Sequence, residues 1–206
     1  MPAINLPITF DELFPASQST QLIGAPKLMG LYRLMQYAYS LEGEAAEVGI
    51  YKGGTSLFIA RAMPAKRLYM YDTFSGMPVE DESIDFHSIG EFADCSLVEV
   101  INLLHTHNVG NTFFRVGIFP ESIGDERNKE FCFVHVDGDQ YQTTKDAIEF
   151  FYPRLVSDGI MVFDDFDWIH CRGVRKALDE FFANRVESVK RSGYSANQAY
   201  IVKGQP

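Results

Sequence analysis

The chain has few cysteines and few basic residues, and both shortages restrict what it can be. Its three cysteines, Cys95, Cys132 and Cys171, lie far apart and form no Cys-x-x-Cys pair. An odd, scattered set of thiols favours reduced cysteines over a disulfide framework. The 18 Lys and Arg residues are outnumbered by 28 Asp and Glu, which gives a net charge of −10. Binding to a nucleic-acid backbone requires a basic face, so we expect no nucleic-acid partner.

Long apolar runs are also missing. The N-terminus lacks a basic segment followed by an apolar stretch, and no run approaches the length of a membrane span. We therefore expect a cytoplasmic protein with no membrane partner. A length of 206 residues is enough for one domain with a substantial core.

Strand-like and helix-like patterns alternate along most of the chain, which predicts a three-layer α/β domain. The predicted strands are residues 45–49, 67–71, 112–116, 131–136 and 159–163, and the predicted helices are 27–41, 55–63, 96–107, 143–155 and 171–182. Two closing strands, 186–190 and 198–202, are expected to form a terminal hairpin. The first two dozen residues show no clear periodicity, which predicts a loose arm.

One connection is too long for a simple strand-to-helix loop. Residues 73–95 contain two glycines, a proline and the acids Glu80, Asp81, Glu82 and Asp85. Loops of this length in a compact domain are usually functional or mobile. A solvated acidic surface loop is an equally good interpretation.

Paired carboxylates follow two of the predicted strands. Asp137 and Asp139 come after residues 131–136, and Asp164 and Asp165 come after residues 159–163. A helix-length segment between the strands predicts a right-handed crossover, so both strands end at the same edge of the sheet. Four carboxylates gathered there repel one another unless a proton or cation neutralises them. A hard divalent cation with oxygen ligands suits this arrangement.

A glycine-rich turn joins the first strand to its helix and contains Gly49, Gly53 and Gly54. The backbone of such a turn can approach a ligand closely, and the helix start that follows supplies free N–H groups. The spacing matches neither the dinucleotide fingerprint nor the P-loop. Asp72 ends the next strand, where it could accept hydrogen bonds from a ribose or serve as a turn or N-cap residue. Together, the turn and Asp72 indicate a nucleoside-binding half-sheet.

Several motifs occur in an order that resembles the macrocin O-methyltransferase (TylF-like) family. They are Glu47-Val-Gly-x-x-x-Gly-Gly-Thr-Ser, Tyr71-Asp-Thr-Phe-x-Gly-Met-Pro78, Asp137-Gly-Asp-x-Tyr-x-Thr-Thr144, Tyr152-Pro-Arg-Leu155, Asp164-Asp165 and Cys171-Arg172. The resemblance covers about residues 43–182. It implies a Rossmann-like class I methyltransferase fold, with a mostly parallel seven-stranded sheet and a C-terminal antiparallel hairpin. Residues 1–42 would form an N-terminal arm and helix, and residues 43–206 the S-adenosylmethionine-dependent methyltransferase domain.

The resemblance also implies site residues, a methyl donor and a metal. The donor would be S-adenosylmethionine, the metal Mg2+, and the acceptor a hydroxyl of a small molecule such as a sugar or phenolic natural product. The implied metal ligands are Asp137, Asp164 and Asp165. The implied general base is Asp139. His170 lies close to the acidic cluster in the sequence, so it is a second candidate for base or substrate contact, and an exposed loop histidine is an equally good interpretation. The implied cofactor-binding residues are Glu47, Gly49, Gly53, Gly54, Thr55, Ser56, Asp72, Thr73, Ser96 and Asp137.

Three questions stay open on the sequence. The roles of Asp137 and Asp139 as ligand and base could be exchanged. A non-catalytic protein that binds S-adenosylmethionine or another small molecule is the alternative function, although a sensor would have little reason to keep four repelling carboxylates. The oligomeric state is undetermined, and a homo-oligomer is compatible with the sequence. His135 lies on a buried strand and is expected to be a core histidine.

Overall fold

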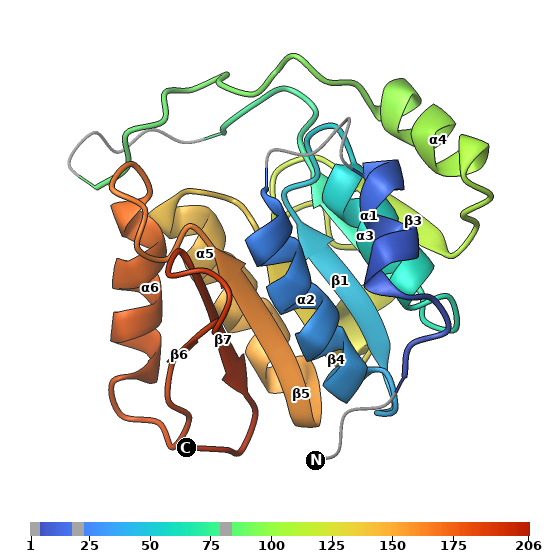
Figure 1. Cartoon of the computed structure of the whole chain (residues 1–206). Helices are drawn as coiled ribbons and strands as arrows, with labels where there is room; N and C mark the ends of the chain where they lie inside the picture. Colours follow the sequence, from blue (N-terminus) through green and yellow to red (C-terminus); the bar gives the residue numbers. More distant parts are fainter. Residues whose placement is uncertain (1–4, 18–22, 79–83) are drawn as a thin grey trace.

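A seven-stranded sheet forms the centre of the fold, in the order β3-β2-β1-β4-β5-β7-β6 (Figure 1). The computed structural model describes residues 5–17, 23–78 and 84–206. The strands are β1 (Glu44–Val48), β2 (Leu68–Asp72), β3 (Thr112–Val116), β4 (Phe131–Val136), β5 (Leu155–Asp164), β6 (Lys190–Arg191) and β7 (Gln198–Val202). The helices are α1 (Phe10–Ser17), α2 (Ala25–Ala38), α3 (Gly54–Ala62), α4 (Leu97–Thr106), α5 (Tyr141–Phe151) and α6 (Arg172–Phe182), with short 3-10 turns η1 (Asp125–Asn128) and η2 (Tyr152–Arg154).

Strands β1 to β5 are parallel, while β7 pairs antiparallel with β5 and β6 pairs antiparallel with β7. The register places Val48 of β1 beside Val136 of β4, and Val136 beside Phe163 of β5. These three strands therefore end level with one another, so the residues that follow them meet at one edge of the sheet. The predicted α/β fold, with its C-terminal antiparallel strands, is confirmed.

Helices cover both faces of the sheet and bury two separate apolar layers (Figure 1). Helices α1 to α4 contribute to the layer that contains Ala45 and Phe133, whereas α5 and α6 pack on the layer that contains Ala46 and Val134. Successive strand residues thus point to opposite faces, as the pleat requires. Because both faces are covered, the central strands are apolar almost throughout, which is typical of parallel sheets.

The N-terminal region differs from the expected loose arm, because residues 10–17 form helix α1. Leu13 is fully buried, and the Phe10 ring contacts the rings of Tyr32 and Phe58. The helix has only eight residues and includes Pro15, so its sequence carries too little periodicity to reveal it. The terminal hairpin also differs, since its first strand is residues 190–191 instead of 186–190.

The connection between β2 and α4 crosses the top of the molecule in the view of Figure 1. Glu80, Asp81 and Glu82, part of its expected acidic run, lie outside the described residues. Asp85 is buried, its backbone forms an isolated bridge with Cys171, and its carboxylate accepts a 2.8 Å hydrogen bond from the Tyr141 N–H. This part of the connection is therefore tied to the starts of α5 and α6.

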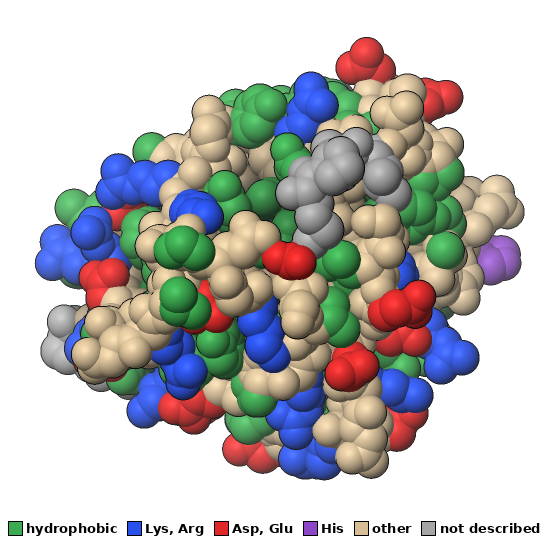
Figure 2. Space-filling view, turned by 90° about the horizontal axis from the view of Figure 1, so that it is seen from below, with side chains coloured by type: hydrophobic (Ala, Val, Ile, Leu, Met, Phe, Trp, Pro, Cys, Tyr) green, Lys and Arg blue, Asp and Glu red, His purple; other side chains and the backbone are tan. Residues whose placement is uncertain are grey.

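Surface charge is mixed on the side that faces downward in Figure 1. Figure 2 shows Lys and Arg side chains interspersed with Asp and Glu across this face. No broad basic surface is visible in that view. Within the described residues, no helix is long and apolar enough to cross a membrane.

Candidate functional site

A cavity of about 400 Å³ opens at the carboxyl edge of the sheet. Each of the five parallel strands contributes to its wall, through Gly49 after β1, Asp72 at the end of β2, Gly117 after β3, Asp137 after β4 and Asp165 after β5. Ligands of open α/β sheets bind at this edge.

The first turn brings the ends of β1 and β4 into close contact. Gly49 has a φ of +86°, and a Cβ there would lie 2.0 Å from the carbonyl oxygen of Asp137. Only glycine fits, both because of this contact and because side chains disfavour that backbone conformation. Gly54 and Thr55 line the cavity from the start of α3. Gly53 does not line the cavity, and a Cβ there would lie 2.7 Å from Val100 Cγ1 of α4, so its expected contact with the cofactor is untested.

Asp72 holds the first turn against the end of β2. Its Oδ2 accepts hydrogen bonds from the N–H groups of Ile50 at 2.7 Å and Tyr51 at 2.9 Å, and its Oδ1 accepts one from Phe74 at 2.7 Å. The carboxylate also lines the cavity. The turn interpretation is therefore confirmed, and binding of a ribose at the same carboxylate stays a prediction. Thr73 lines the cavity as well, and its hydroxyl donates to the Gly76 carbonyl at 2.7 Å.

Glu47, Ser56 and Ser96 lie outside the residues that line the cavity. Glu47 is fully buried, and its carboxylate accepts hydrogen bonds from the Ser56 hydroxyl and from His135. Ser96 caps α4, because its hydroxyl oxygen accepts from the Glu99 N–H at 3.3 Å. In the structure these residues support the site's framework, and their expected contacts with the cofactor are untested.

Three carboxylates face one another in the part of the cavity beyond strands β4 and β5. One oxygen each from Asp137, Asp139 and Asp165 lies within 4.8 Å of the others. Lys27 reaches this cluster from α2, with its Nζ 2.9 Å from Asp165 Oδ1 and 3.5 Å from Asp164 Oδ2. The convergence of four acids that the crossover predicted is therefore observed, with a lysine added.

Burial and mutual repulsion raise the pKa values of the carboxylates on the cavity side. Burial, with the charges of Asp164 and Asp139, raises the pKa of Asp137 well above its usual range. Burial and the Asp165 charge raise the pKa of Asp139 to about 6. Burial acts to lower the pKa of the Lys27 ammonium, but the three nearby carboxylates Asp164, Asp137 and Asp165 outweigh it and raise that pKa. The raised carboxylate pKa values and the Lys27 ammonium both reduce the repulsion within the cluster.

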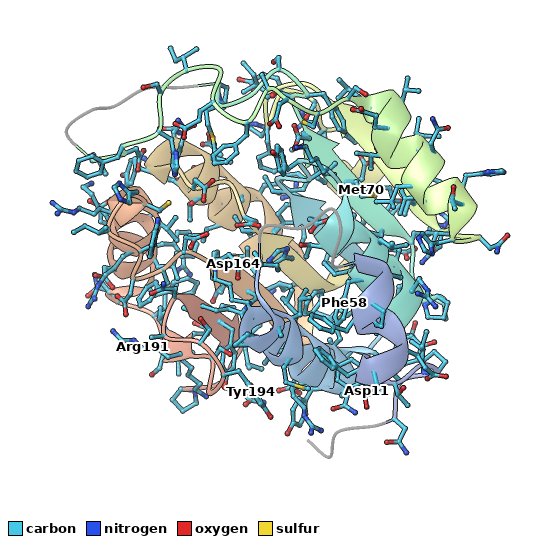
Figure 3. All side chains as sticks on the ribbon, turned by 45° about the horizontal axis from the view of Figure 1, so that its top comes forward. Asp11, Phe58, Met70, Asp164, Arg191 and Tyr194 are labelled. Atoms are coloured by element: carbon cyan, nitrogen blue, oxygen red, sulfur yellow. The ribbon has the colours of Figure 1, made fainter. Side chains whose placement is uncertain are left out.

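The Asp164 carboxylate contacts buried side chains of the protein interior. Its Oδ1 accepts a 2.8 Å hydrogen bond from Gln198 Nε2, and its Oδ2 lies 3.7 Å from His135 Nε2. The other ring nitrogen of His135 is 3.1 Å from Glu47. Burial would lower the pKa of His135, but its interactions with the neighbouring Asp164 and Glu47 carboxylates raise it to about 10. His135 is completely buried between the two acids, as expected of a core histidine. Figure 3 labels Asp164 deep within the molecule.

The acids that face the cavity therefore differ in part from the expected metal ligands. Asp137 and Asp165 belong to both sets, whereas Asp139 lines the cavity and Asp164 does not. Asp164 still lies within 4.8 Å of Asp137, in a group with His135, so its expected role as a metal ligand is untested. Three carboxylate oxygens this close together suit the oxygen-rich coordination that Mg2+ prefers, so these residues fit the implied metal.

His170 is exposed and is not among the residues that line the cavity. Its ring packs on Phe86 and Trp168, with centroids 5.7 and 5.8 Å apart. Trp168 does line the cavity. A direct catalytic role for His170 is untested.

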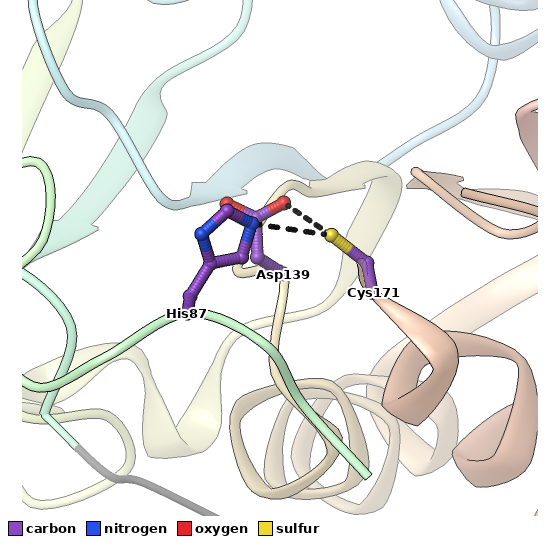
Figure 4. Close-up of side chains that lie close together, drawn as sticks. All are labelled: His87, Asp139 and Cys171. Atoms are coloured by element: carbon purple, nitrogen blue, oxygen red, sulfur yellow. Dashed lines mark hydrogen bonds between the residues drawn. The ribbon is translucent and has the colours of Figure 1, made fainter. Parts of the chain in front are cut away.

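Two cavity residues, Lys27 and His87, were missed by the sequence reasoning. Lys27 is a polar interruption on a largely buried helix, which is a weak signal that could have been noticed. His87 belongs to the irregular connection 73–95, where no periodicity marks it. Its Nε2 lies 3.6 Å from Cys171 Sγ, which in turn lies 3.5 Å from Asp139 Oδ1 (Figure 4).

Comparison with protein families and curated proteins gives consistent matches. The family described as Macrocin-O-methyltransferase (TylF) matches residues 12–190. The 8-demethyl-8-(2,3-dimethoxy-alpha-L-rhamnosyl)-tetracenomycin-C 4'-O-methyltransferase of Streptomyces olivaceus is 28% identical over an alignment of 181 residues, with 72% of this chain and 65% of that protein covered. Demethyldecarbamoylnovobiocin O-methyltransferase of Streptomyces niveus is 22% identical over an alignment of 186 residues, with 82% of this chain and 70% of that protein covered. The chain thus spans 65% and 70% of the length of these two relatives.

Solved structures show the same architecture. The calicheamicin methyltransferase CalS11 has a TM-score of 0.79 at 19% identity, over 98% of this chain and 88% of that one. The O-methyltransferase NovP has a TM-score of 0.75 at 17% identity, over 89% of this chain and 81% of that one. At these identities the likeness shows the fold alone.

Proposed function

Because the chain belongs to the macrocin O-methyltransferase (TylF) family, we propose that it transfers a methyl group from S-adenosylmethionine to a hydroxyl of a small molecule. The acceptor class that we favour is a sugar hydroxyl of a glycosylated natural product. The name of the Streptomyces olivaceus relative, which is 28% identical, describes a rhamnosyl compound as its substrate. Methylation of a phenolic hydroxyl is the second acceptor class that the test below includes.

The observation that carries this proposal is the division of one cavity into two chemically different parts. Along the strand order, the glycine turn, Thr55 and Asp72 line the cavity beyond β1 and β2, and the acids Asp137, Asp139 and Asp165 line it beyond β4 and β5. The two parts meet where Gly49 contacts Asp137. A nucleoside with a cationic sulfonium suits the first part, because backbone N–H groups, a close backbone approach and a carboxylate are available there. The acidic part suits the acceptor hydroxyl, because the oxygen of that hydroxyl must become more anionic before methyl transfer.

Methyl transfer to oxygen is an in-line displacement, so the acceptor oxygen must lie opposite the sulfur, close to the methyl carbon. We propose that Gly49 and Gly54 admit the methionyl part, and that Asp72 holds the ribose and so fixes the sulfur. Asp139 accepts the hydroxyl proton on its carboxylate. Its pKa of about 6 leaves it ionised at neutral pH and still basic enough for that step.

Asp137 and Asp165 would hold Mg2+ beside the acceptor. When bound, Mg2+ would orient the acceptor oxygen and lower the pKa of its hydroxyl. Asp164 lies behind them, where its contacts with Gln198 and His135 keep the end of β5 in place. We therefore assign Asp164 a positioning role.

Titration with S-adenosylhomocysteine and a methyl-transfer screen over sugar, catechol and phenol hydroxyls, each with and without Mg2+, test the proposal. We expect cofactor binding and Mg2+-dependent transfer to at least one hydroxyl class. Asp139→Asn should abolish transfer while the affinity for S-adenosylhomocysteine changes little. The control Asp179→Asn alters an exposed acid on α6 and should change neither methyl transfer nor the affinity for S-adenosylhomocysteine.

Two results would overturn this function. Absence of S-adenosylhomocysteine binding in every condition would exclude a methyltransferase. Binding without transfer to any hydroxyl would favour a non-catalytic small-molecule-binding protein.

A further inference from the structure

Three donor atoms of different chemistry meet at one point on the cavity wall. They come from separate segments: His87 from the connection between β2 and α4, Asp139 from the loop after β4, and Cys171 from the residue before α6 (Figure 4). One nitrogen, one sulfur and one carboxylate oxygen all lie within 4.8 Å of one another. All three residues line the cavity.

Two of the three separations match those of ligands around one tetrahedral ion, and the third is within 4.8 Å. With Zn–S of about 2.3 Å and Zn–N or Zn–O of about 2.1 Å, tetrahedral angles place sulfur about 3.5 Å from nitrogen or oxygen. The observed distances from Cys171 Sγ are 3.6 Å to His87 Nε2 and 3.5 Å to Asp139 Oδ1. An ion could therefore enter with little movement of these side chains. A thiol hydrogen-bonded to its neighbours would show similar distances, so the donor chemistry must distinguish the two interpretations.

The donor set favours a borderline cation over Mg2+. Hard Mg2+ prefers oxygen ligands, whereas Zn2+ and Co2+ accept thiolate and imidazole. The cluster of Asp137, Asp139 and Asp165 is all oxygen, while the neighbouring group supplies nitrogen, sulfur and oxygen. The two groups share Asp139 and otherwise differ.

The surroundings orient both of the softer donors. The Nδ1 of His87 lies 3.1 Å from Glu91 Oε2, which leaves Nε2 directed to the cluster. A carboxylate on the second ring nitrogen is the usual support of a metal-bound histidine. Cys171 is 1% exposed, and its backbone is fixed by a 3.0 Å hydrogen bond to the Trp168 carbonyl and by the bridge to Asp85.

We propose that His87 Nε2, Cys171 Sγ and Asp139 Oδ1 form a three-ligand site for a borderline divalent cation such as Zn2+, with a fourth position open to the cavity. Three protein ligands with one open position are the arrangement of accessible zinc sites. On binding, the Cys171 thiol releases its proton to solvent, while His87 binds as neutral imidazole with its proton on Nδ1. No electron is transferred and no other bond changes.

A second consequence rests on the proposed function. Because Asp139 belongs to both groups, Zn2+ held by His87 and Cys171 removes this carboxylate from its role as base. Zn2+ should therefore inhibit methyl transfer even with Mg2+ in excess, and Cys171→Ser should relieve the inhibition.

The site is tested on the full chain freed of metal, without methyl donor or acceptor. Zn2+ is titrated against a competing chelator, and Co2+ is added as a spectroscopic probe of thiolate coordination. We expect one Zn2+ per chain and a thiolate-to-cobalt absorption band. Cys171→Ser should abolish the band, and both Cys171→Ser and His87→Gln should weaken Zn2+ binding at least tenfold. The controls Cys95→Ser and His105→Gln change the same residue types outside the cavity, and both variants should bind Zn2+ with the affinity of the parent protein.

A missing cobalt band, or equal Zn2+ affinity in the parent, Cys171→Ser and His87→Gln, would overturn the proposal. His87 lies in a loop, so His87→Gln keeps the test valid if Cys171→Ser fails to fold. The readout needs neither S-adenosylmethionine nor an acceptor. The zinc site can therefore fail while the methyltransferase function stands, and the reverse also holds.

Discussion

Replacing Lys27 with methionine should destabilise the metal-free protein by about 3 kcal/mol. Methionine keeps much of the side-chain volume and removes only the charge. Coulomb's law with an effective dielectric constant of about 20 gives roughly 5 kcal/mol of gross attraction for each of the Lys27 contacts with Asp164 and Asp165. Desolvation cancels most of this, and removing one partner of a buried pair typically costs about 3–5 kcal/mol. The Asp165 side chain is 20% exposed, so water stabilises part of its charge when Lys27 is lost, and we expect the lower end of that range.

Urea and thermal unfolding in the presence of a chelator measure the effect. For a chain of this size, about 3 kcal/mol corresponds to a fall of about 6–12 °C in Tm. Added Mg2+ should restore more stability to K27M than to the parent, because the cation replaces the lost positive charge. The matched control is K52M, which removes an ion pair with Asp94 at 2.7 Å. Both partners of that pair are largely exposed, so the loss should be much smaller.

The reasoning would be refuted if K27M lost no more stability than K52M. It would also be refuted if Mg2+ raised the Tm of K27M and of the parent equally. Either result would mean that Lys27 does not neutralise the carboxylates of the cavity.

Two further substitutions test the framework of the site. Gly49→Ala places a Cβ 2.0 Å from the Asp137 carbonyl oxygen, so it should lower the free energy of unfolding in urea by well over 2 kcal/mol and abolish S-adenosylhomocysteine binding. Gly90→Ala, at a similar positive φ in open space, should lower it by only about 1 kcal/mol. Equal losses of stability in the two variants would mean that the contact with Asp137 is not what requires glycine. Glu47→Gln removes the charge beside buried His135 and should cost about 3 kcal/mol. An unchanged midpoint would contradict this, and titration of the same variant with S-adenosylhomocysteine reports separately whether Glu47 contacts the cofactor.

Most of the sheet could be predicted because its strands carry strong local patterns. The bounds of β3 and β4 agree with the sequence to the residue, and the right-handed crossover rule placed Asp137 and Asp165 at one edge. The family resemblance supplied the number of strands. Helix α1 was missed and strand β6 was predicted a few residues too early, because short elements are stabilised by tertiary contacts that leave little periodicity.

The site was predictable only where its residues follow strands directly. The inward position of Asp164 depends on Gln198, its partner across the antiparallel β5–β7 pair, 34 residues away in the chain. Lys27 and His87 approach from elements separated in sequence from the acids that they meet. No local pattern encodes such contacts, so the lysine counter-charge and the histidine–cysteine pair became visible only in three dimensions.

The contact between Gly49 and the Asp137 carbonyl also affects how the protein could be redesigned. It leaves no free space between β1 and β4, so the floor of the cavity is fixed. The remaining walls include α2 with Lys27 and the connection 73–95 with His87, and both are attached to this floor from outside the sheet. A new acceptor specificity is therefore best sought by exchanging those two segments while the strand ends stay unchanged.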